Sequence, residues 1–86
     1  MLYAKRGEAY LKLKRPNAAI ASADSALKMN PDSAKAFKVR GMARRMLAQW
    51  EAAAADLGTG LNIDFDDVTA AAAKIVIEKA HIVKTR

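Results

Sequence analysis

A stripe of mostly cationic residues near the middle of the chain carries the most suggestive chemistry. The spacing i, i+3, i+7 and i+10, which falls on one face of a helix, is occupied by Lys35, Lys38, Met42 and Arg45. Such a face suits the acidic surface of another protein, with methionine as an adaptable apolar contact. The competing interpretation is a set of ordinary solvated side chains, because most lysines and arginines lie in water.

The formal charge of +6 is unevenly distributed along the chain. Residues 1–50 hold 11 Lys and Arg against 3 Asp and Glu, a balance of +8, whereas residues 51–86 carry −2. A one-sided positive field steers acidic partners and raises their association rate. Phosphates respond to the same field, so nucleic acid is a second class of partner. It is the less favoured class, because the stripe offers no aromatic residue on which a base could stack.

The sequence contains no arrangement typical of catalysis. It has no cysteine, one histidine, no Gly-rich phosphate loop and no nucleophile elbow. The adjacent carboxylates of Asp66 and Asp67 are better explained as caps of a helix N-terminus than as an acid–base pair. We therefore predict neither an enzyme nor a cofactor or metal site.

The composition also bears on location. No segment approaches the roughly 20 apolar residues of a membrane-spanning helix, and the first residues lack the apolar region of a signal peptide. The absence of cysteine is compatible with a reducing compartment. We expect a cytoplasmic protein without a membrane partner.

The sequence repeats itself with a period of 34 residues. Among the superimposed pairs are Arg6 with Arg40, Gly7 with Gly41, Leu13 with Leu47, Ala19 with Ala53, Leu27 with Leu61 and Asp32 with Asp66. Each period reads as helix, turn, helix, with Pro16 opening the second helix and Pro31 ending it. We expect an all-α fold with helices over about 1–14, 17–30, 33–48, 50–62 and 67–84.

The last of these helices has an apolar face that could cover the second helix pair. Its members at helical spacing include Val68, Ala72, Ile75 and Val76. Glycine weakens a helix by roughly 1 kcal/mol relative to alanine, so Gly58 and Gly60 in the fourth helix need a reason. We interpret them as the place where the fifth helix approaches the fourth closely.

Small and large residues occupy fixed places in each repeat. The first repeat has Gly7, Ala19 and Ala26 with Tyr3, Tyr10 and Pro31, and the second has Phe37, Gly41, Ala53 and Gly60. This pattern resembles the tetratricopeptide family. The resemblance implies an α–α superhelix in which residues 1–86 form one domain, with repeats over 1–31 and 32–65 and a capping helix over 66–86. Solenoids usually need three or more repeats, so we expect a fragment of a larger protein.

Longer segments resemble one branch of that family, the Hip cochaperones. They are residues 15–20 (RPNAAI), 30–35 (NPDSAK), 40–43 (RGMA), 49–53 (QWEAA) and 63–67 (IDFDD). The resemblance implies binding to the ATPase domain of the 70-kDa heat-shock chaperone and stabilisation of its ADP state. It also implies a longer parent protein that forms a homodimer through segments absent here. Plant proteins that fuse a Hip-like repeat region to thioredoxin share these segments, and the chain does not separate the two parents.

In tetratricopeptide arrays the first helix of each repeat lines the concave face. Carried onto this sequence, the expected contacts with a protein partner are Lys5, Glu8, Lys12, Lys35, Lys38, Met42 and Arg45. Trp50 stands at the start of the fourth helix, where Pro16 stands in the first repeat, and we predict a packing role for it.

A different tetratricopeptide site, the carboxylate clamp, grips the acidic C-terminal tail of heat-shock chaperones. Its members have Asn where this chain has Lys5, Lys where it has Lys35, and Arg where it has Val39. Only Lys35 is retained, and Val39 cannot donate a hydrogen bond. Binding of acidic tails by this geometry is therefore the less favoured alternative.

Overall fold

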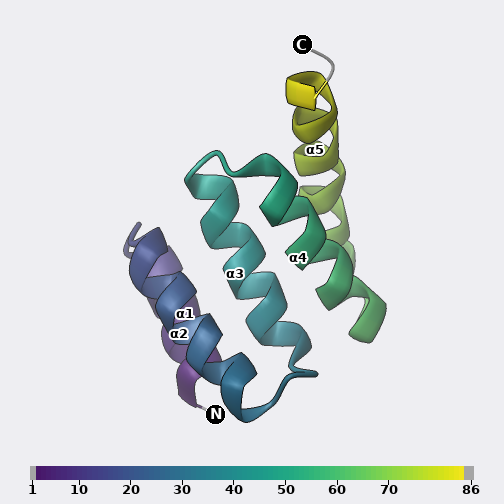
Figure 1. The fold of residues 1–86 in the computed structure, drawn as a ribbon. Helices are drawn as coiled ribbons and strands as arrows, with labels where there is room; N and C mark the ends of the chain where they lie inside the picture. The colour runs from purple at the N-terminus through teal and green to yellow at the C-terminus, as the bar shows by residue number, and fades with distance from the viewer. Residues whose placement is uncertain (1, 85–86) are drawn as a thin grey trace.

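The protein is built from five α-helices, seen in a computed structural model that describes residues 2–84, with side chains over 4–80 (Figure 1). The helices are α1 (Leu2–Lys12), α2 (Pro16–Met29), α3 (Ala34–Met46), α4 (Trp50–Ile63) and α5 (Asp67–Lys84). The described residues contain no strand, so the predicted all-α repeat fold is confirmed. In this part of the chain no helix combines the length and the apolarity that crossing a bilayer requires.

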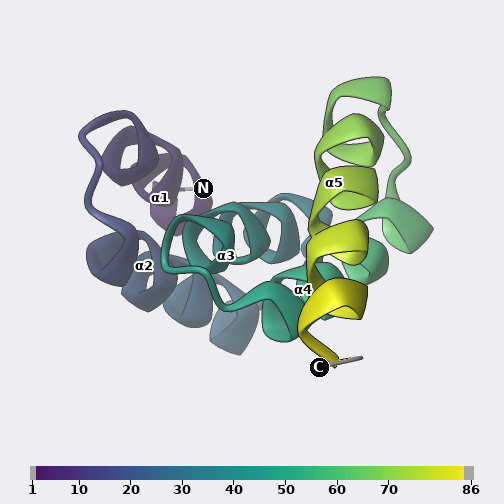
Figure 2. The same cartoon turned by 90° about the horizontal axis from the view of Figure 1, so that it is seen from above.

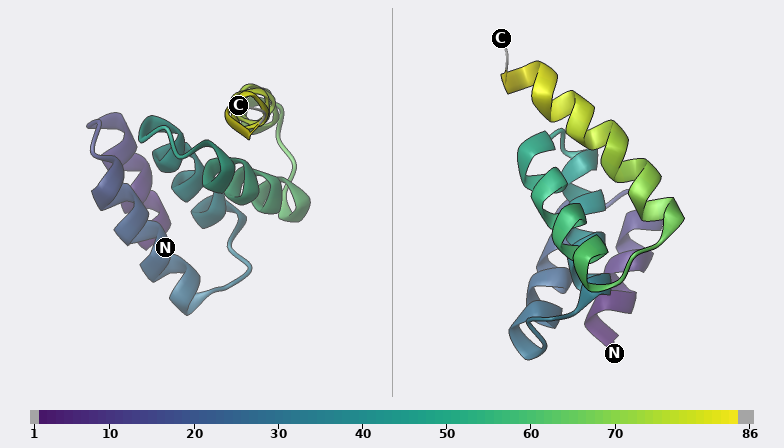
Figure 3. Two further views of the ribbon diagram at one scale, coloured as in Figure 1. Left: turned by 45° about the horizontal axis from the view of Figure 1, so that its top comes forward. Right: turned by 90° about the vertical axis from the view of Figure 1, so that its right-hand side faces the viewer.

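The helices form two layers. Seen from above, α1, α3 and α5 make a curved layer with α3 at its bottom, and α2 and α4 lie beneath it (Figure 2). Each helix packs against the next along the chain, and α1 also packs against α3. The last helix is steeply inclined to α4, as the end-on view of α5 in the left panel of Figure 3 shows. The first helix of each pair therefore lies on the hollowed side of the molecule.

Both helix hairpins turn at the same place in the repeat. Lys14 and Ala48, which are 34 residues apart, adopt left-handed backbone conformations with φ of 61° and 60°. The N–H of the residue after each one bonds a carbonyl five residues back, from Arg15 to Tyr10 and from Gln49 to Arg44, which closes a Schellman motif. The helices consequently end at Lys12 and Met46, two residues before the predicted ends.

The core consists mainly of alanines at helix contacts. One cluster of buried residues joins α2 and α3 and contains Ala19, Ala23, Ala36, Val39 and Ala43. A second joins α4 and α5 and contains Ala53, Leu57, Ala73 and Val76. Such small side chains bring helix backbones close together, which makes the fold sensitive to single added methyl groups.

The predicted apolar face of α5 is only partly right. Ala72 and Val76 are buried as expected, and Ala73 joins them, but Val68 and Ile75 lie exposed. The steep inclination of α5 explains this, because a helix that crosses its neighbour contacts it over a short stretch. The buried stretch is centred on residues 72–76.

The interpretation of the two glycines in α4 was wrong. A Cβ added at Gly60 would lie 2.8 Å from Cγ of Lys38 and 3.2 Å from the carbonyl oxygen of Ala34, so the close neighbour is α3 and not α5. A Cβ at Gly58 would meet nothing within 4 Å. Glycine at position 60 thus lets the start of α3 reach α4, and the structure gives no reason for glycine at 58.

Candidate protein-binding groove

A groove follows α3 on the concave side and consists of two hollows that meet at Leu11 and Met42. The first, of about 420 Å³, is called the ion-pair hollow and is lined by Glu8, Leu11, Lys35, Lys38, Val39, Met42, Asp64, Asp66 and Thr69. The second, of about 410 Å³, is called the Trp50 hollow and is lined by Leu11, Lys14, Met42, Arg45, Met46 and Trp50. The α3 residues at successive helical turns thus form one wall along the whole groove.

The structure gathers most of the predicted contact residues at this groove. Glu8, Lys35 and Lys38 line the ion-pair hollow, Arg45 lines the Trp50 hollow, and Met42 lines both. Lys5 and Lys12 lie exposed on α1 and line neither hollow. The stripe predicted from the spacing of α3 residues therefore lies on a concave surface. Of the three contact residues predicted on α1, only Glu8 lines this surface.

Lys38 is bound within the protein. Its Nζ lies 2.5 Å from Oδ2 of Asp66 and also donates to the backbone carbonyl of Asp64, and its side chain is only 15% exposed. The connection between α4 and α5 folds back over the start of α3 and supplies both oxygens. Lys38 therefore joins α3 to this connection rather than presenting an open cation.

Asp66 serves two partners at once. One oxygen accepts from Lys38, and Oδ1 accepts the backbone N–H of Thr69 at 2.6 Å, which caps α5 as the acidic residues before it predicted. The hydrogen bond from Lys38, followed by the one from the Thr69 backbone, lowers the pKa of Asp66 to about 2. The carboxylate is consequently ionised throughout the physiological range.

Lys35 is held far more loosely. Its Nζ lies 3.6 Å from Oε1 of Glu8 on α1, and both side chains remain about half exposed. Exposed pairs of this kind contribute between zero and about 1 kcal/mol. A partner can therefore separate Lys35 from Glu8 at little energetic cost.

One end of the groove is less basic than the predicted contact residues, which included Glu8 as their one carboxylate, had indicated. Three carboxylates and two ammonium groups line the ion-pair hollow, whereas the Trp50 hollow is lined by Lys14 and Arg45 without a carboxylate. The physical reason is the returning α4–α5 connection, which brings Asp64 and Asp66 onto the basic stripe. The charge balance along the sequence counted Asp64 and Asp66 with residues 51–86 and so did not show that they reduce the positive charge of the groove.

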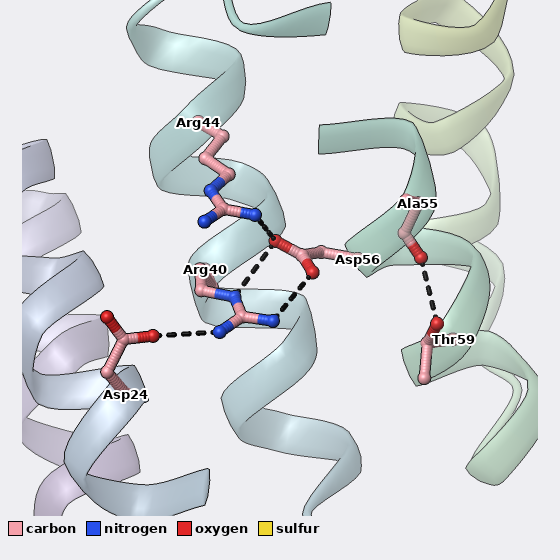
Figure 4. A network of polar contacts seen from close by, with 6 residues as sticks. All are labelled: Asp24, Arg40, Arg44, Ala55, Asp56 and Thr59. Atoms are coloured by element: carbon pink, nitrogen blue, oxygen red, sulfur yellow. Dashed lines mark hydrogen bonds and ion pairs between the residues drawn. The ribbon is translucent and has the colours of Figure 1, made fainter. Parts of the chain in front are cut away.

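The opposite side of α3 holds an ion-pair network that the sequence analysis missed (Figure 4). Both guanidinium nitrogens of Arg40 that face Asp56 bond its carboxylate at 3.0 Å, and Arg44 bonds the same group at 2.8 Å. Arg40 also reaches Asp24 on α2 at 2.8 Å. The repeat offered a signal, because the buried Asp56 falls on Ser22 of the first repeat.

Trp50 combines the predicted packing role with a place in the groove. It is partly buried against the cluster of α4 and α5, and Nζ of Lys79 lies 5.7 Å from its ring centroid, within cation–π range. The ring also lines the Trp50 hollow. The stripe on α3 itself offers no aromatic residue, and Trp50 on the neighbouring α4 adds one to the groove.

The position that an arginine occupies in carboxylate clamps is closed. Val39 is 3% exposed, and a Cβ added at Gly7 would lie 2.7 Å from its Cγ1. The valine therefore fills the contact between α1 and α3. A side chain so buried has almost no surface with which to grip a bound tail.

Comparison with curated proteins reveals several relatives of this chain. It is 55% identical over 67 residues, 78% of its length, to the TPR repeat-containing thioredoxin TDX of Arabidopsis thaliana. It is 51% identical over 69 residues, 80% of its length, to Hsc70-interacting protein 1 of Drosophila melanogaster. An Arabidopsis FAM10 family protein is 51% identical over 81 residues, 94% of the chain.

These matches confirm the resemblance that was read from the sequence, to Hip and to a tetratricopeptide thioredoxin alike. The chain spans about 18% of the length of each of the three relatives. No family model matches it.

Proposed function

We propose that this chain is a protein-interaction module that binds the ATPase domain of the 70-kDa heat-shock chaperone along the groove on α3. Binding there stabilises the ADP state of the chaperone and slows nucleotide release. The observation that carries the proposal is a continuous groove, lined by five of the seven expected contact residues, in a chain about half identical to Hsc70-interacting proteins.

The groove has the composition of a protein-binding surface. Its centre is apolar, with Leu11 and Met42 shared by both hollows, and its edges carry Lys35, Glu8 and Arg45. Protein interfaces commonly combine an apolar centre with a charged rim. Lys5 and Lys12, which lie outside the hollows on α1, belong to the proposed contact set as outer charges that steer the approach of an acidic surface.

Three further parts of the proposal follow from the resemblance to the Hip cochaperones. We assign the chain no catalytic role, a cytoplasmic location, and a longer parent protein whose dimerisation uses segments other than these. The absence of cysteine in the sequence is compatible with the location.

Calorimetric titration of the chain with the chaperone ATPase domain tests the proposal. We expect tighter binding in ADP than in ATP, together with slower release of a fluorescent ADP analogue when the chain is present. Equal affinity in both nucleotides, or no binding, contradicts the proposal. Parallel titrations with the acidic tail peptide and with single-stranded RNA test the two alternatives. Tighter binding of the tail peptide than of the ATPase domain would support the carboxylate clamp, and tighter binding of RNA would support nucleic-acid binding.

Charge reversal at the groove localises the contact. Lys35→Glu should weaken binding by roughly tenfold, since it replaces an attractive charge with a repulsive one at the rim. Lys28→Glu is the matched control, because Lys28 is an exposed lysine on α2 that lines neither hollow. Equal effects of the two variants would show that only the overall charge matters.

A further inference from the structure

The two hollows of the groove differ in whether their cationic side chains have carboxylate partners. In the ion-pair hollow Lys38 and Lys35 both have carboxylate partners. Among residues 4–80, Lys14 and Arg45 of the Trp50 hollow have none, and the Arg45 guanidinium donates only a weak hydrogen bond to Sδ of Met42, at 3.9 Å. Two cations therefore flank an otherwise apolar hollow.

The floor of the Trp50 hollow suits a large apolar side chain. It is made by four residues from three helices: Leu11, Met42, Met46 and Trp50. Its volume of about 410 Å³ lies in the range of roughly 300–1,000 Å³ typical of ligand pockets. Methionines adapt their shape to an incoming group, and tryptophan and arginine are enriched where interface energy concentrates.

From this combination we infer that the Trp50 hollow receives one large apolar side chain from an acidic segment of the protein partner. Carboxylates on either side of that apolar residue pair with Lys14 and Arg45. The inference rests on the proposed function. It adds the recognition element in the partner, an apolar residue between acidic residues, which the Trp50 hollow binds at one end of the groove.

The hollow is pre-organised for such an occupant. The backbone at Lys14 is fixed by the bond from its N–H to Leu11 at 3.0 Å and by the bond from Arg15 to Tyr10 at 2.9 Å. Trp50 is anchored against the core of α4 and α5. Groups already held in place lose less conformational entropy when a partner binds.

A protein segment fits better than a nucleic acid base. Base stacking needs an open aromatic face, but the Trp50 ring is packed against the α4–α5 cluster and has the Lys79 ammonium over it. The ring can contribute its remaining apolar surface without displacing that ammonium. The apolar floor then contacts a side chain rather than stacking on a base.

The test uses the single tryptophan of the 86-residue chain as a reporter. The indole N–H signal of Trp50 is followed by NMR while two blocked pentapeptides, EELEE and EEAEE, are added. We expect EELEE to move the signal saturably and to bind about tenfold more tightly, because the leucine buries two to three more methylene equivalents. Equal binding of the two peptides overturns the apolar part of the inference.

Variants separate the charges. Arg45→Gln should weaken EELEE binding by roughly tenfold, because a charge-assisted hydrogen bond is lost, and Lys14→Gln should weaken it in the same direction. Lys28→Gln on α2 removes the same charge away from the hollow and should leave the affinity unchanged. Equal losses in all three variants, or tighter binding of oligouridylate than of EELEE, overturn the inference.

The outcome is distinguishable from failure of the proposed function. If the chaperone ATPase domain binds the chain but EELEE leaves the Trp50 signal in place, the recognition element is wrong and the groove function stands. If EELEE binds and the ATPase domain does not, the hollow is a site for acidic apolar segments and the named partner is wrong.

Discussion

On the side of α3 that faces α2 and α4, Arg40 and Arg44 share the buried carboxylate of Asp56, whereas on the groove side Lys35 is loosely paired and Arg45 has no carboxylate partner within residues 4–80. Cations of the same types thus hold the fold together on one side, while on the groove side Lys35 and Arg45 remain available to a partner and only Lys38 is tied to the α4–α5 connection. What decides between these uses is the position of acidic residues on neighbouring helices. A count of cations along α3 does not reveal it.

Removing the buried carboxylate should give the largest effect. Asp56, with its side chain 7% exposed, is the counter-charge of both arginines. Asp56→Ala should lower the free energy of unfolding by about 3–5 kcal/mol, because it leaves the partly buried Arg44 without an anion and Arg40 with only the exposed Asp24. Urea unfolding followed by circular dichroism measures this loss, and a chain without helical signal would be its extreme form.

The first repeat provides the control for that experiment. Ser22 is buried at the position equivalent to Asp56 but carries no charge. Ser22→Ala should cost about 1 kcal/mol or less. A loss for Asp56→Ala as small as that for Ser22→Ala would break the comparison, because the inner side of α3 would then not depend on its ion pairs.

A smaller effect on the free energy of unfolding is expected when acid protonates Asp66, which pairs with Lys38 and ties the groove side of α3 to α5. The pKa of Asp66 is lowered to about 2 in the folded chain from an ordinary value of 3.8, so its contribution to stability is present above pH 4 and disappears as the pH falls toward 2. Unfolding by urea at a series of pH values measures how steeply the free energy of unfolding falls with pH between about 4 and 2. Asp66→Asn should make this fall less steep, and an unchanged dependence on pH would exclude Asp66 as its source.

The turn after α3 should respond in the opposite direction. Ala48 has a left-handed backbone, which costs a residue other than glycine about 1 kcal/mol, so Ala48→Gly should raise stability by up to that amount. Ala21, exposed within α2, is the matched control, since Ala21→Gly should destabilise by about 1 kcal/mol. Melting temperatures compare the two. Ala48→Gly also provides a more stable background in which to measure the loss caused by Asp56→Ala.

The smallest effect on stability is expected at Lys35. Its pair with Glu8 is exposed, so Lys35→Ala should change the free energy of unfolding by no more than about 0.5 kcal/mol. The variant should nevertheless bind the chaperone ATPase domain less well. A stability loss comparable to that of Asp56→Ala would show that Lys35, like Lys38, holds the fold together.

The parts of this structure that the sequence predicted depend on patterns that can be read without knowing which helices pack together. Pro16 and Pro31 marked the helix boundaries, and the 34-residue period with its small residues indicated the paired helices. The stripe on α3 followed from helical spacing alone. The proline and spacing signals lie within one helix or one turn, and the period is read by comparing the sequence with itself.

The parts that were missed depend on residues far apart in the sequence. Lys38 is bound by Asp66, 28 residues later, and is therefore not open to a partner. Arg40 is bound by Asp56, 16 residues later. These pairs form only once α4 and its connection to α5 have packed on α3. The inclination of α5, which exposes Val68 and Ile75, is likewise set by packing rather than by periodicity.

Methionine methyl signals test most directly whether the partner occupies the groove. Met42 and Met46 line the hollows along α3, whereas Met29, 75% exposed at the end of α2, lies outside them. When unlabelled chaperone ATPase domain with ADP is added to chain labelled at its methionine methyl groups, we expect the Met42 and Met46 signals to move while Met29 stays. Movement of Met29 with Met42 and Met46 unchanged would contradict the account.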